Sequence, residues 1–98
     1  MVESKSGQGI KRRKITFSLE SADADEVIVT GDFNNWDPKK HPMKKDENGN
    51  WIKTVMVLPG KYEYKFLVDG QWKEDPKNKD LNSNCFGTYN NILNVMAK

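Results

Sequence analysis

Three tryptophans, Trp36, Trp51 and Trp72, are the residues of this sequence with the most evident chemistry. An indole ring has a large flat surface with a negative face, which attracts polarised C–H groups and cations. The chain has 98 residues, of which 36% are hydrophobic and 31% charged, so its core is too small to bury all three rings easily. We therefore expect at least one tryptophan to face solvent and to mark a contact site.

The turn before Trp72 predicts where its ring lies. Residues 69–70 (Asp-Gly) are a strong signal for a two-residue hairpin of type I′, which places Leu67 opposite Trp72 and Lys65 opposite Glu74. Because side chains alternate between the faces of a strand, these four share an outer, mostly wet face. The core-facing set of the same strand is then Tyr62, Tyr64, Phe66 and Val68. The alternative is that Trp72 covers a sheet edge or folds over Leu67.

The other two tryptophans have different settings. Trp36 lies in a long loop, residues 31–42, whose asparagines and prolines are typical of a binding loop on a rigid scaffold. Trp51 begins an alternating strand and is predicted to lie on the core side. Trp36 and Trp72, with lysine and asparagine nearby, suit a sugar, because axial C–H groups stack on an indole while polar side chains reach the hydroxyls. Such an open site nets about 5–6 kcal/mol, so it needs several consecutive sugar units.

Residues suited to catalysis are sparse. The single histidine, His41, is predicted to be a solvated loop residue, and Cys85, beside Phe86, a small semi-buried filler. The fourteen carboxylates show no spacing typical of a general acid and base, although a pair assembled in space stays open. No phosphate-binding, dinucleotide-binding, calcium or zinc motif occurs. We expect no enzyme, no catalytic residue, no metal and no cofactor.

Charge is concentrated at the N-terminus. The first fourteen residues hold five of the 16 basic and one of the 14 acidic residues, which leaves a net charge of −2 on the remainder. We therefore expect no nucleic-acid partner, and residues 11–14 (KRRK) are interpreted as part of a solubilising tail, with a phosphate or acidic partner as the alternative. No apolar run is long enough to span a membrane. One cysteine and no secretory signal predict a cytoplasmic protein.

The elements that must position these residues are strands. Residues 1–13 are predicted to be a disordered basic tail, and residues 14–98 one module. Period-two or apolar segments predict strands at residues 15–20, 27–30, 51–58, 61–68 and 92–96, separated by turn residues, with a polar connection at 75–87. No helical period is evident. The pattern predicts an all-β sandwich of antiparallel strands.

Four motifs in order resemble the family 48 carbohydrate-binding modules. They are residues 31–36 (GDFNNW), 58–66 (LPGKYEYKF), 68–72 (VDGQW, followed by Asp75 and Pro76) and 86–91 (FGTYNN). The resemblance covers residues 14–96. The family includes the glycogen-binding domain of the AMP-activated protein kinase β subunit and the N-terminal early-set domains of branching and debranching enzymes.

The resemblance implies an immunoglobulin-like, early-set β-sandwich that binds α-1,4-glucans such as glycogen, starch and maltooligosaccharides without catalysis. Trp36 and Trp72 match the family's stacking tryptophans. Two further positions, Lys65 and Asn90, match its sugar-contacting lysine and asparagine. Phe86 matches a hydrophobic residue that inserts into the curve of the glucan, and Thr88 matches a lesser contact.

Two departures from the kinase subunit limit the resemblance. Residues 43–46 (MKKD) stand where that subunit has a phosphorylatable serine, so we expect no kinase-type regulation. The kinase subunit also continues into a domain that contacts other subunits, so this sequence is expected to be either a free-standing module or part of something larger. The alternative function is a protein-interaction module that docks a partner, such as a glycogen-metabolising enzyme or a kinase subunit, with a vestigial glucan site.

Overall fold

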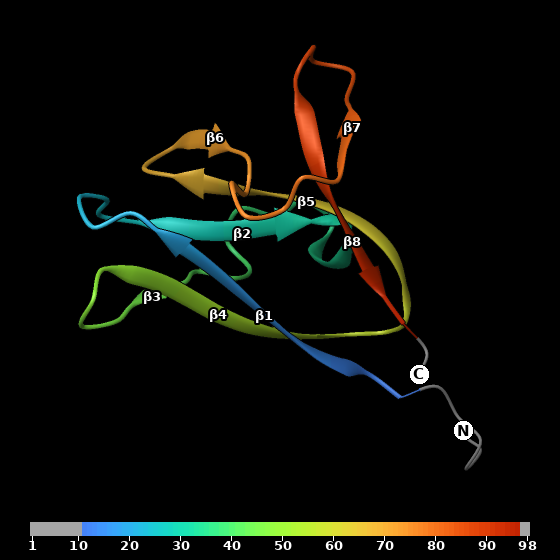
Figure 1. The fold of residues 1–98 in the computed structure, drawn as a ribbon, viewed down its shortest axis with the longest axis horizontal. Coiled ribbons are helices and arrows are strands. Elements are labelled where there is room, and N and C mark those ends of the chain that lie inside the picture. The colour runs from blue at the N-terminus through green and yellow to red at the C-terminus, as the bar shows by residue number, and fades with distance from the viewer. Residues whose placement is uncertain (1–10, 97–98) are drawn as a thin grey trace.

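Short antiparallel strands make up almost all of the regular structure, as the period-two pattern predicts. A computed structural model describes residues 11–96, and Figure 1 shows their arrangement. The elements are β1 (Arg13–Glu20), β2 (Val27–Gly31), the 3-10 turn η1 (Asp32–Asn34), β3 (Lys44–Lys45), β4 (Asn50–Val57), β5 (Gly60–Val68), β6 (Gln71–Lys73), β7 (Leu81–Ser83) and β8 (Tyr89–Val95).

The strands form two sheets that face each other. One sheet has the order β1-β4-β3, and the other has the order β2-β5-β8-β7, with β6 added to β5. In Figure 1 the first sheet lies below the second, and the β7–β8 hairpin rises away from both. This confirms the prediction of an all-β sandwich with antiparallel pairing. Within residues 11–96 no helix is long and apolar enough to cross a membrane.

The core lies between the sheets and contains the inward-facing residues of the long strands. Strands β1 and β4 supply Phe17 and Trp51, and the opposite sheet supplies Val29 and Phe66, all at most 7% exposed. Trp51 also donates its indole N–H to the Ser21 carbonyl at 2.8 Å, which satisfies its one polar group. Its predicted place on the core side is confirmed.

The β5–β6 hairpin has the predicted register. Residues 69 and 70 have φ of 48° and 83°, the two positive values that a type I′ turn requires. Leu67 pairs with Trp72 and Val68 with Gln71. The ladder ends at Lys73, before the expected Lys65–Glu74 pair.

Two short strands lie outside the segments that were predicted to be strands. The two-residue strand β3 pairs with β4, and β7 lies inside the segment 75–87 that was predicted to be a polar connection. Both are too short to show a period-two pattern, and all of their residues are exposed. The first strand begins at Arg13, and the first ten residues of the predicted disordered tail lie outside the described residues.

Candidate functional site

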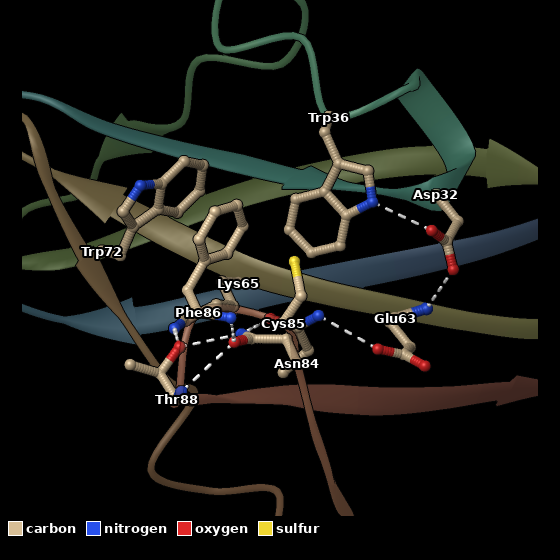
Figure 2. Close-up of a pocket in the computed structure, with 10 residues that line it drawn as sticks. Asp32, Trp36, Glu63, Lys65, Trp72, Asn84, Cys85, Phe86 and Thr88 are labelled. Atoms are coloured by element: carbon tan, nitrogen blue, oxygen red, sulfur yellow. Dashed lines mark hydrogen bonds between the residues drawn. The ribbon is translucent and has the colours of Figure 1, made fainter.

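A concave site of about 720 Å³ lies on the outer face of the β2-β5-β8-β7 sheet. Its walls come from the loop after β2, from β5 and β6, and from the β7–β8 hairpin (Figure 2). Ten residues line it: Asp32, Trp36, Glu63, Lys65, Trp72, Asn84, Cys85, Phe86, Thr88 and Asn90. All six site residues predicted from the sequence are in this set, although they come from four separate segments of the chain.

The turn that carries Trp36 is held by the side chain of Asn34. Asn34 is 6% exposed, accepts the Gly31 backbone N–H on Oδ1 at 3.0 Å, and donates from Nδ2 to the Val29 carbonyl at 3.2 Å. Asn35 and Trp36 then adopt the left-handed region with φ of 59° and 58°. A non-glycine pair in this region needs such outside constraint.

The indole of Trp36 is oriented by a carboxylate. Its Nε1–H donates to Asp32 Oδ1 at 2.9 Å, and Asp32 Oδ2 accepts the Glu63 backbone N–H at 2.8 Å (Figure 2). Asp32 therefore ties the ring to β5. Sequence reasoning did not identify Asp32 as a site residue, although its position four residues before the tryptophan was visible.

Trp72 completes an angled pair of aromatic surfaces. It is 52% exposed, as the hairpin register predicted. The ring centres of Trp36 and Trp72 are 6.2 Å apart, and their planes meet at 67°. A ligand chain that lies on both rings must therefore bend between them.

Lys65 is buried, which corrects the prediction that it lies on a wet face. Only 6% of it is exposed, and its Nζ donates to Thr88 Oγ1 at 3.3 Å. The physical reason is that the β7–β8 hairpin and the tryptophans cover the sheet there, so the aliphatic stem packs under them while the ammonium reaches the pocket wall. The position of Lys65 on the site face, opposite the core, is as predicted.

Asn84 organises the β7–β8 hairpin, and the sequence analysis missed it. Its Oδ1 accepts the backbone N–H groups of Phe86 and Thr88 at 2.9 and 3.2 Å. Its Nδ2 donates to Thr88 Oγ1 at 2.8 Å and to Asn90 Oδ1 at 3.0 Å. The sequence feature that could have identified Asn84 is its position three residues before Gly87, a glycine that has φ of 80° in the turn.

Asn90 has a defined amide orientation. Its Oδ1 accepts from Asn84, and its Nδ2 donates to Glu63 Oε1 at 3.0 Å, while Asn82 donates to the other Glu63 oxygen at 2.9 Å. A primary amide has two donors and two lone pairs, so Asn90 keeps one N–H and one lone pair for a ligand. Thr88 Oγ1 receives two donors, which leaves its own O–H free to donate.

The tip of the hairpin presents an unsupported aromatic ring. Phe86 is 85% exposed, and in the view of Figure 2 its ring stands between those of Trp36 and Trp72.

Cys85 is an exposed free thiol that lines the pocket, so the prediction of a semi-buried filler is wrong. The tight turn leaves no neighbouring element to cover it.

His41 also differs from its prediction. It is half-buried, with Nδ1 2.8 Å from Asn34 Nδ2 and its ring centre 6.0 Å from that of Phe33. Burial and the nearby Lys53 and Lys40 lower the pKa of His41 below its ordinary value. The loop packs on β2 in the folded protein, so His41 is less exposed to solvent than its place in a polar loop predicted.

Groups that commonly hold metals do not gather here. Among the described residues no three histidine, cysteine or acidic side chains are placed to bind a metal ion together.

Burial, with a hydrogen bond to Asp75, raises the pKa of Tyr64 well above its ordinary value, and Tyr64 lies on the core side, away from the pocket. The arrangement of the pocket is suited to binding a neutral, polar and curved ligand.

Comparison with known proteins agrees with this geometry. Residues 14–98 match the family described as the glycogen recognition site of AMP-activated protein kinase. The chain is 47% identical over 74 residues to protein PTST homolog 2, chloroplastic, of Arabidopsis thaliana, which is 76% of this chain and 13% of that protein.

Two further relatives cover similar stretches. Protein FLOURY ENDOSPERM 6, chloroplastic, of Oryza sativa subsp. japonica is 33% identical over 88 residues, 90% of this chain and 16% of that protein. The 5'-AMP-activated protein kinase subunit beta-1 of Homo sapiens is 41% identical over 70 residues, 71% of this chain and 24% of that protein. The chain thus spans about an eighth to a quarter of the length of these relatives.

Proposed function

The chain belongs to the family of glycogen recognition sites of AMP-activated protein kinase, and from this premise we propose that it binds α-1,4-glucans such as glycogen, starch and maltooligosaccharides. The observation that carries the proposal is the pair of indoles at 67° over one concave site. An α-1,4-glucan curves from one glucose to the next, so successive units can lie on surfaces that are inclined to each other.

The proposed contacts follow from the free groups of the site. Trp36 and Trp72 stack on successive glucose units, each contributing about 0.5–1.5 kcal/mol beyond area burial. Lys65 and Asn90 hydrogen-bond to hydroxyls, with Thr88 as a further donor. Phe86, the most exposed of the large hydrophobic side chains described, packs into the inner side of the curve.

The module is proposed to act by binding alone. The carboxylates of the pocket, Asp32 and Glu63, each accept hydrogen bonds that orient a binding side chain, Trp36 or Asn90. Because both carboxylates orient side chains that are proposed to bind the ligand, they support a role in recognition, and we assign no proton transfer to them. Incubation with glycogen that yields a shortened product would overturn it.

Isothermal titration with maltoheptaose tests the function. We expect a dissociation constant of roughly 0.1 mM for the wild type, and no measurable heat for the double variant Trp36→Ala and Trp72→Ala. Tyr89→Ala is the matched control, because Tyr89 is an exposed aromatic on the hairpin that does not line the pocket. Absence of wild-type binding at millimolar ligand would contradict the function, and full binding by the double variant would contradict the site.

A second candidate is the docking of a glycogen-metabolising enzyme or a kinase subunit. The outer face of β4 exposes Ile52 and Met56, at 38% and 50%, on the sheet opposite the pocket. Retention of the wild type on beads that carry the kinase catalytic subunit, but not on amylose resin, would favour this function. Loss of that retention in Met56→Glu would place the contact on β4.

The compartment stays a prediction. The cytoplasmic location rests on the single cysteine, since reducing compartments leave thiols free. Two of the relatives carry a chloroplast location in their names. Fluorescence of the tagged full-length protein distinguishes the two locations.

A further inference from the structure

His41 contacts the turn that carries Trp36 without lining the pocket itself. Its backbone carbonyl accepts the Val29 N–H at 3.1 Å, which attaches the returning loop to β2. Its ring atom Nδ1 lies 2.8 Å from Asn34 Nδ2. Asn34 in turn bonds Gly31 and Val29, the residues from which the Trp36 turn departs. The imidazole of His41 therefore contacts Asn34, the side chain that supports the turn carrying Trp36.

The hydrogen bonds of Asn34 determine which form of His41 fits. Because Asn34 Oδ1 accepts from the Gly31 N–H and Nδ2 donates to the Val29 carbonyl, the amide cannot be turned round without losing both bonds. The Asn34 atom that faces His41 is thus a donor, and Nδ1 must accept with its lone pair. This is the neutral imidazole that carries its proton on Nε2. An imidazolium would bring two donors face to face.

The groups around the His41 ring also favour the neutral imidazole. The charged groups that bear on it are both cations, Lys53 from β4 and Lys40 from its own loop. Phe33 and Asn34, from η1, contribute only neutral groups. Partial burial and these two ammonium groups oppose a charged imidazole, so the neutral form persists below the ordinary histidine pKa of about 6.5.

We propose that His41 is a positioning residue for the stacking platform, so that neutral His41 holds Trp36 through Asn34 and protonated His41 releases it. Protonation repels the Asn34 amide and weakens its bonds to Gly31 and Val29. The left-handed φ of Trp36 is then less constrained, and the ring loses its fixed angle to Trp72. Where it concerns glucans, the inference rests on the proposed function.

The sign of the pH effect follows from the direction of the pKa shift. A histidine whose folded pKa is lowered stabilises the folded turn above its unfolded pKa, about 6.5, and this stabilisation is lost as the pH falls through the folded value. Glucan affinity is therefore complete at neutral pH and falls on the acid side of about pH 6.5. The loss of one hydrogen bond to a repulsive contact corresponds to roughly three- to tenfold in affinity.

Three variants at two positions test the role of the ring nitrogen by maltoheptaose titration from about pH 8 to about pH 5. His41→Asn puts an amide oxygen near the position of Nδ1, so it accepts from Asn34 without titrating, and we expect wild-type affinity with a flat pH profile. His41→Phe keeps a ring against Phe33 but has no acceptor, so it should bind weakly at every pH. Lys53→Gln removes a cation from the ring and should move the affinity loss to higher pH.

Spectra without ligand separate this inference from the proposed function. In ¹⁵N spectra the Trp36 indole N–H should shift with the acid transition in the wild type and stay constant in His41→Asn. If neither the wild type nor any variant binds maltoheptaose, the proposed glucan function is contradicted. In that case the change of the Trp36 indole signal with pH still shows whether His41 is coupled to Trp36. An indole signal or an affinity profile that is the same in the wild type and in His41→Asn overturns the role of His41.

Discussion

Single side chains that orient other side chains of the pocket hold much of this site in place. Asp32 orients the Trp36 indole, Glu63 orients the Asn90 amide, and Asn84 supports three groups of the β7–β8 hairpin. Each uses a charged or bifunctional polar group to fix the direction of another side chain. A ligand then meets groups whose orientations are already set, which reduces the ordering cost of binding.

Asn84→Ala is expected to weaken maltoheptaose binding about tenfold, because it removes four hydrogen bonds that order Phe86, Thr88 and Asn90. Calorimetric titration measures the change. Asn82→Ala is the matched control on the same hairpin, since Asn82 donates only to Glu63, and it should lose much less. Equal losses in the two variants would contradict the organising role of Asn84.

Thr30→Val is expected to stabilise the fold by about 1 kcal/mol. Among the described residues, Thr30 Oγ1 is the buried side-chain atom with no hydrogen-bond partner, and the residue is 0% exposed. Valine has the same shape and no polar group to desolvate. The midpoint of urea unfolding measures the effect. Thr54→Val is the control: its hydroxyl is exposed and bonded to Thr16, so it should give no gain.

At the scale of elements, the site depends on how closely β2 approaches β5. Gly31 pairs with Tyr64, and a Cβ atom built on Gly31 would lie 2.4 Å from the Glu63 carbonyl oxygen and 2.8 Å from Tyr64 Cβ. Its backbone is extended, so the reason for glycine is space rather than a positive φ. The close approach lets β2 end directly beneath the turn that carries Trp36.

Gly31→Ala is therefore expected to lower the free energy of unfolding by about 3 kcal/mol, because backbone atoms must move to relieve the contact. Gly70→Ala provides the comparison: nothing lies within 4 Å, but φ is +83°, so we expect a cost of about 1 kcal/mol. Denaturant unfolding monitored by tryptophan fluorescence measures both. A larger loss in Gly70→Ala than in Gly31→Ala would contradict the steric explanation.

At the scale of the whole molecule, the inner and outer faces of the two sheets have different roles. Their inner faces share one apolar core, while the outer face of the β2-β5-β8-β7 sheet carries the pocket. The β7–β8 hairpin projects away from both sheets, as Figure 1 shows. Residues of this hairpin form one wall of the pocket. With residues 1–14 set aside, the chain has a net charge of −2, which fits a neutral polysaccharide better than a polyanion.

Local sequence was sufficient to predict the main strands and one wall of the site. Alternation in β5 and the Asp-Gly turn depend only on neighbouring residues, so the Leu67–Trp72 register was predictable. The motifs that resemble the carbohydrate-binding family identified Trp36, Phe86, Thr88 and Asn90 as candidates for the same surface. The strands β3 and β7 were not predictable, because pairing with β4 and β8 defines them and each is too short to show a period-two pattern.

By itself, the sequence determined the all-β class, the core side of Trp51 and the outward direction of Trp72, since each follows from side-chain alternation over a few residues. Only the tertiary structure decided the burial of Lys65, the exposure of Cys85 and the contact of His41 with Asn34. Burial and hydrogen bonding across 23 residues, as between Lys65 and Thr88, depend on which distant elements pack together. Alternation along one strand carries no information about that packing.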